Sequence, residues 1–82
     1  METFQIMLVK VNHRMQKAPQ MQEVFTKFGC NIKMRLGLHE AGDACSNEGL
    51  IVLQLVGNEE EFASFQRELE ALEGITTKRV SI

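Results

Sequence analysis

One polar segment near the middle of the chain holds the side chains best suited to chemistry. His39 and Cys45 are six residues apart, with Glu40 and Asp43 between them. An imidazole, a thiolate and carboxylates can together bind zinc, nickel or cobalt. Two such ligands do not complete a site, so another histidine or cysteine would have to join them. His39 and Cys45 are therefore candidate metal ligands, and the simpler interpretation is a surface loop that carries them incidentally.

A second polar segment follows the first apolar run of the chain. It contains Asn12, His13 and Arg14, and it precedes a predicted helix. The free N–H groups and the dipole of a helix N-terminus favour anions. No glycine-rich phosphate loop is present. We predict that these three residues bind a small carboxylate- or phosphate-bearing effector, with a solvated polar turn as the alternative.

Composition argues against several other classes of function. A catalytic Cys–His pair with Cys30 or Cys45 lacks any supporting motif, so we expect no enzyme and no cofactor. The net charge is −2 and the chain has no Trp or Tyr, which argues against nucleic-acid binding. No apolar run reaches the roughly 18 residues of a membrane span, and none resembles a secretory signal. With two cysteines and no disulfide framework, we expect a cytoplasmic protein.

Local signals predict two helices. Pro19 suits the first turn of a helix, where its missing N–H costs nothing. Asn58 is a good N-cap, and Glu61 three residues later completes the pattern of a capping box. Gly29 and Gly74 are expected to end the two helices, because glycine can adopt the left-handed conformation found just past a last turn.

Strand-like runs surround both helices, so the order strand–helix–strand occurs twice. This order predicts one α+β domain over residues 1–82. We expect a ferredoxin-like βαββαβ sandwich, in which a four-stranded antiparallel sheet carries both helices on one face. The predicted strands are Phe4–Asn12, Asn31–Leu38, Gly49–Val56 and Ile75–Ile82.

Two of these runs, residues 4–11 and 50–56, are apolar on both faces. A sheet that meets water on one side usually alternates between apolar and polar residues. Two helices can cover only one face, so we predict that a second copy covers the other, as a homodimer or homotetramer. A monomer that tolerates the exposed face is the alternative. The residues predicted to line the interface are Met7, Val9, Val52 and Leu53.

Short motifs along the chain resemble those of a known family. The run from Arg35 to Leu38, Arg-Leu-Gly-Leu, follows a helix that ends in Phe-Gly. It is similar to strand two of the small ACT-like regulators, which include the iron-only hydrogenase system regulator family. It also resembles the C-terminal domain of the nickel-responsive repressor. The resemblance extends from about Phe4 to Ile82 and includes the segments Gly49–Leu53 and Leu72–Ile75, with Lys78.

The resemblance implies a ferredoxin-like regulatory domain that dimerises or tetramerises and can bind an effector between subunits. In the nickel repressor this region carries a His-x-His-x5-Cys pattern. His39 and Cys45 match its last two positions, and Gly37 stands where the first histidine would be. The repressor also has a separate N-terminal DNA-binding module, and here only about three residues precede the first predicted strand.

We therefore predict a non-enzymatic regulatory or small-effector-binding domain that acts as a homo-oligomer. As a transcriptional regulator it would lack its own DNA-binding module, so we expect no direct contact with nucleic acid and none with a membrane. The alternative is a metal-sensing or metal-binding domain that uses the loop from His39 to Cys45.

Overall fold

The computed structural model describes residues 3–12, 18–38 and 49–82. Within these segments the chain forms four strands and two α-helices, with one 3-10 turn, η1, before the second strand. The elements are β1 (Gln5–Val11), α1 (Ala18–Lys27), η1 (Gly29–Asn31), β2 (Ile32–Leu38), β3 (Gly49–Leu55), α2 (Glu59–Glu70) and β4 (Ile75–Ser81).

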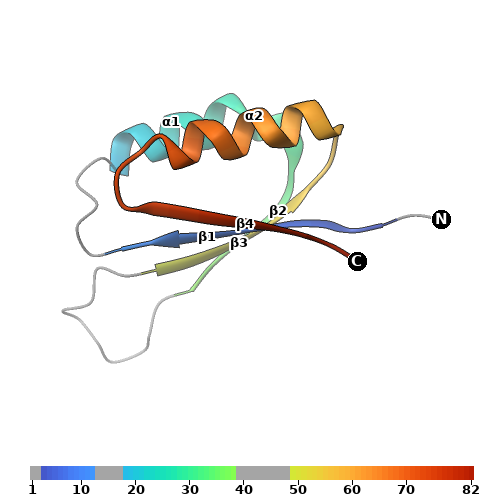
Figure 1. Cartoon of the computed structure of the whole chain (residues 1–82), viewed down its shortest axis with the longest axis horizontal. Coiled ribbons are helices and arrows are strands. Elements are labelled where there is room, and N and C mark those ends of the chain that lie inside the picture. The colour runs from blue at the N-terminus through green and yellow to red at the C-terminus, as the bar shows by residue number, and fades with distance from the viewer. Residues whose placement is uncertain (1–2, 13–17, 39–48) are drawn as a thin grey trace.

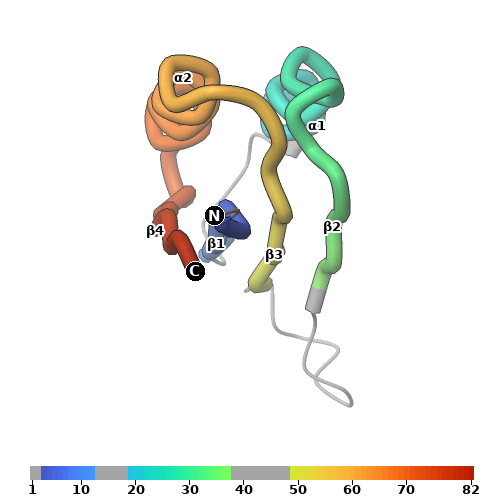
Figure 2. The backbone as a smooth tube through the Cα atoms, turned by 90° about the vertical axis from the view of Figure 1, so that its right-hand side faces the viewer, coloured from blue at the N-terminus to red at the C-terminus, as the bar shows by residue number. Residues whose placement is uncertain are grey.

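The strands form one antiparallel sheet in the order β2-β3-β1-β4. Both helices lie on the same face of this sheet, and no described element lies on the other (Figures 1 and 2). Since each half has the order strand, helix, strand, the two apolar runs become the central pair, β1 and β3. The predicted ferredoxin-like fold is confirmed.

The start of α2 follows from local sequence. The Asn58 side chain accepts a hydrogen bond from the Glu61 N–H at 2.9 Å, and the Glu61 carboxylate accepts one from the Asn58 N–H at 3.0 Å. This is the predicted capping box. Gly74 has a φ of +90° before β4, whereas Gly29 lies in η1 outside the left-handed region. The left-handed helix end predicted at Gly29 is therefore wrong.

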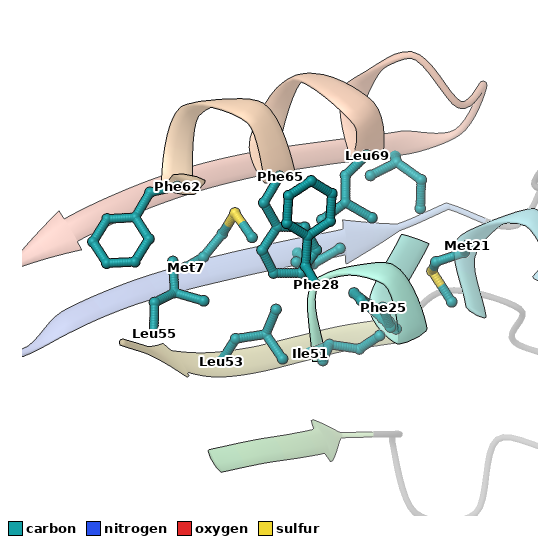
Figure 3. Close-up of a cluster of buried hydrophobic side chains, with 12 residues drawn as sticks. Met7, Met21, Phe25, Phe28, Ile51, Leu53, Leu55, Phe62, Phe65 and Leu69 are labelled. Carbon is teal, nitrogen blue, oxygen red and sulfur yellow. The ribbon is translucent and has the colours of Figure 1, made fainter. Parts of the chain in front are cut away.

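The core fills the layer between the helices and the sheet (Figure 3). Phe65 of α2 is fully buried at its centre. Its ring stacks on Phe28 at a centroid distance of 4.8 Å and meets the edge of Phe25 at 6.0 Å. These aromatic contacts join α2 to α1 and to the turn that follows it.

Three residues predicted for a subunit interface belong to this core instead. Met7, Val9 and Leu53 have no exposed surface and point toward the helices (Figure 3 labels Met7 and Leu53). Successive side chains of a strand point to opposite faces. Among the four predicted interface residues, only Val52 therefore lies on the face away from the helices.

Candidate functional site: the open face of the sheet

The residues singled out for chemistry are only partly described. Asn12 follows β1, and its N–H donates to the Gly74 carbonyl at 2.9 Å. His13, Arg14, His39 and Cys45 lie outside the described residues, so the predictions made for them remain predictions. In the described segments, no three His, Cys, Asp or Glu side chains come together to hold a metal ion. No helix there is long and apolar enough to cross a membrane.

Strand pairing shows which side chains share the open face, the sheet surface away from the helices. On the central strand β1 these are Ile6, Leu8 and Lys10, because the residues between them are buried under the helices. The pairing extends each into a row across the sheet. The rows, written from β2 to β4, are Met34–Gln54–Ile6–Val80, Leu36–Val52–Leu8–Lys78 and, without β2, Leu50–Lys10–Thr76.

A further row lies at the end where β1 begins. The Ile82 N–H donates to the Phe4 carbonyl at 3.0 Å, and the Phe4 N–H donates back to Ile82. By the same alternation, Phe4 and Ile82 lie on the open face, and so does Val56 after β3. These residues add an apolar end to the surface.

The exposed apolar residues are concentrated on this one face. In the described segments, seven large hydrophobic side chains are exposed, and strand alternation assigns all of them to the open face. A random distribution would place some on the outer sides of the helices. The seven are Phe4, Met34, Leu36, Leu50, Val56, Val80 and Ile82.

The size of the open face can be compared with known surfaces. Strands are about 4.8 Å apart and rise about 3.3 Å per residue, so four strands of about eight residues span roughly 500 Å². This footprint, which includes a few polar positions, is comparable in area with the largest apolar patches on typical monomers, which run to about 600 Å². Two such faces would bury about 1,000 Å² together, which is the lower bound of a specific interface.

The charges on the open face are all positive. Lys10 and Lys78 are exposed next to Thr76 at one corner, and no acidic side chain lies on the strands' open face in the described segments. The acidic residues Glu59, Glu60 and Glu61 are instead in the first turn of α2, on the other side of the sheet. The open face therefore has a basic corner and, apart from Gln54, an apolar surface.

On the helix-covered side of the sheet, charged side chains contact other side chains of the same domain. Arg79 on β4 donates two hydrogen bonds to the Glu59 carboxylate, at 2.6 and 3.0 Å. These bonds lower the pKa of Glu59 and raise that of Arg79. On the edge strand β2, the Arg35 guanidinium lies 4.6 Å from the centre of the Phe25 ring. This cation–π contact covers the core. These contacts indicate that Arg79, Glu59 and Arg35 stabilise the fold.

A buried amide connects η1 to the start of α2. The Asn31 side chain donates to the Val56 carbonyl and to the Glu61 carboxylate, both at 3.0 Å. The hydrogen bond from Asn31, followed by that from the Asn58 N–H, lowers the pKa of Glu61. Gly57 lies against this network with a φ of +132°. The network is a structural clamp, and sequence reasoning missed Asn31 because its partners are 25 and 30 residues away.

No protein-family model and no curated protein matches the chain. Solved structures do match it. The uncharacterized protein TM1266 from Thermotoga maritima superposes with a TM-score of 0.82 at 23% identity, covering 99% of each chain. The ACT domain from GTP pyrophosphokinase of Chlorobium tepidum superposes with a TM-score of 0.67 at 20% identity, covering 95% of this chain and 96% of that one. The chain has an ACT-like fold.

This ACT-like domain also matches part of a larger protein. A formyltetrahydrofolate deformylase from Pseudomonas putida KT2440 superposes with a TM-score of 0.58 at 10% identity, covering 96% of this chain and 28% of that one. At these identities the comparisons show the fold alone. They support the ACT-like part of the resemblance, and no family match supports the hydrogenase-regulator part.

Proposed function

We propose that the ACT-like domain is a non-enzymatic regulatory domain that binds a small effector and works as a homo-oligomer. The observation that carries this proposal is the concentration of all described exposed large hydrophobic side chains on the open face. Water contact with such a surface is unfavourable, by about 25 cal/mol for each Å² that could be buried. A second copy of the chain can bury this surface without any other protein, because it is always present at the same concentration.

We further propose that an effector binds where β1 ends. Asn12 lies where β1 ends, and its N–H is bonded to Gly74 at the entry to β4. We propose that Asn12, with His13 and Arg14, binds a small anionic molecule. An effector that prefers one state of the oligomer shifts the population toward that state, and this requires no catalytic residue. The narrower interpretation, a regulator of an iron-only hydrogenase system, belongs to the same proposal.

The assembly is tested by a pair of neighbouring substitutions. Val52→Asp places a charge on the open face, so we expect a folded protein with the mass of one chain. Leu53→Asp places the same charge in the core, where Leu53 is fully buried, so we expect unfolding. Light scattering gives the mass and far-UV circular dichroism gives the fold. A wild-type protein that is a monomer at high micromolar concentration would refute the homo-oligomer.

The effector site is tested by a thermal-shift screen of amino acids, other small carboxylates, phosphates and nucleotides. A hit is then measured by calorimetry against Arg14→Ala. Losing one charge-assisted hydrogen bond should weaken binding by about tenfold to a hundredfold. Arg67→Ala is the matched control, because Arg67 is exposed on α2 and bonded only locally, to Ser64. Equal binding by the wild type and Arg14→Ala would place the site elsewhere.

A further inference from the structure

The open face is asymmetric along its strands. Lys10 lies near one end of β1, and Phe4 lies just before the other end. Lys10 lies six positions after Phe4, which is about 20 Å in an extended chain. Phe4 is the one aromatic side chain that the described strands place on the open face. A lysine ammonium group is attracted to the face of an aromatic ring within about 6 Å. An arrangement that brings these two ends together would therefore be favoured.

Two symmetric ways exist to stack the same sheet face on itself. The two-fold axis lies between the sheets, and when the strands of the two copies are roughly aligned it runs either along the strands or across them. An axis along the strands keeps each row at its own level, so Lys10 of one copy approaches Lys10 of the other. An axis across the strands reverses the order of the rows, so Lys10 meets the row that contains Phe4.

We propose that two copies pack through their open faces about a two-fold axis that runs across the strands, so that Lys10 of each lies over Phe4 of the other. This inference deepens the proposed homo-oligomer and rests on it. The partner is a second copy because reversing the rows places each charged position opposite an apolar one. It also separates the two Lys10 side chains by about 20 Å.

The other rows fit the same arrangement. Ile6 of one copy faces Leu8 of the second, and Met34 faces Leu36, so apolar side chains meet near the axis. Lys78 of one copy faces the apolar Val80 of the second, and it does so at the edge of the interface, because β4 is an edge strand. The long stem of a lysine lets its ammonium group reach water beside the interface. Lys10, on a central strand, is farther from that edge and therefore gains more from the Phe4 ring.

Two substitutions at one position test the axis. In Phe4→Glu the new carboxylate faces Lys10 of the second copy, whereas in Phe4→Lys two ammonium groups face each other. The dimer dissociation constant, measured by sedimentation velocity, is expected to be at least about tenfold higher for Phe4→Lys than for Phe4→Glu. Added salt should reduce the difference, and Lys10→Met in both backgrounds should abolish it.

Met34→Glu is the control for the surface itself. Met34 and Phe4 are both 58% exposed in the single chain, so neither substitution should affect folding, which circular dichroism checks. The carboxylate introduced by Met34→Glu would face an apolar residue of the second copy, so we expect a monomer. Equal constants for Phe4→Glu and Phe4→Lys would overturn the axis while leaving the homo-oligomer intact. An unchanged mass for Met34→Glu would overturn the open-face interface, and a monomeric wild type would overturn both proposals.

Discussion

Replacing Gly57 by alanine should destabilise the fold far more than the same change at Gly29. Gly57 has a φ of +132°, a region that essentially only glycine occupies. An added Cβ would lie 2.6 Å from the amide nitrogen of Asn31 and 2.8 Å from a carboxylate oxygen of Glu61. Real Cβ atoms essentially never show such contacts, so the Asn31 amide and the Glu61 carboxylate must shift away from Gly57 or the backbone must move.

The expected cost follows from these two effects. Holding a non-glycine residue in this backbone region costs about 1–3 kcal/mol. Displacing the buried Asn31 amide from the Val56 carbonyl adds about 1–3 kcal/mol. The free energy of unfolding should therefore fall by about 2–6 kcal/mol, out of the roughly 5–15 kcal/mol that holds a small domain together. The melting temperature should fall by about 10 °C or more.

Urea denaturation followed by circular dichroism measures this loss, with all proteins at one concentration because assembly contributes to stability. Gly29→Ala is the matched control, since its Cβ would meet no atom within 4 Å and its φ lies outside the left-handed region. We expect Gly29→Ala to change the free energy of unfolding by less than about 1 kcal/mol. If Gly57→Ala is as stable as Gly29→Ala, the clamp between η1 and α2 is not a stability determinant.

Three further predictions concern the core, pH and metal. Phe65→Ala should lower the free energy of unfolding by about 3–5 kcal/mol, because the ring is fully buried against the aromatic rings contributed by the α1 side; a loss below about 1 kcal/mol by urea denaturation would contradict this. The pKa of Glu61 is lowered from its ordinary value of 4.5, so its stabilising contribution is present above that value and is lost as pH falls through the lower folded pKa. Acidification from pH 6 to pH 3 should thus lower the melting temperature of the wild type more than that of Asn31→Ala. Equal decreases in the two proteins would show that the Asn31–Glu61 hydrogen bond does not carry this pH dependence. Cobalt added at one ion per chain should give no thiolate charge-transfer band, and a band that Cys45→Ser abolishes would instead favour the metal-sensing alternative.

Some features were predictable because their causes are local. The capping box at the start of α2 depends on Asn58 and Glu61, three residues apart, and the structure has both of its hydrogen bonds. The order of elements and the central position of β1 and β3 also followed from the sequence. Strands that are apolar on both faces are typical of the centre of a sheet. The connection rules for two βαβ units then leave the ferredoxin-like arrangement, in which β1 and β3 are the central pair.

Because β1 is apolar on both faces, the sequence alone does not show which of its residues face the helices. Along β1 the apolar residues Ile6, Met7, Leu8 and Val9 follow one another, so alternation carries no polar marker that could distinguish the faces. A one-residue shift moves every side chain to the opposite face. The prediction therefore assigned Met7, Val9 and Leu53 to an interface, although they are core residues.

By itself, the sequence determined the fold class, the helix starts and the presence of surplus apolar surface, since these depend on spacing within single elements. Only the tertiary structure decided where that surplus lies. Pairing of four separate strands brings Phe4, Met34 and Val80 onto one face, and it brings Asn31 to Glu61. These contacts join residues far apart in the chain, and their registers are set by the packing of the whole sheet against the two helices rather than by any local pattern.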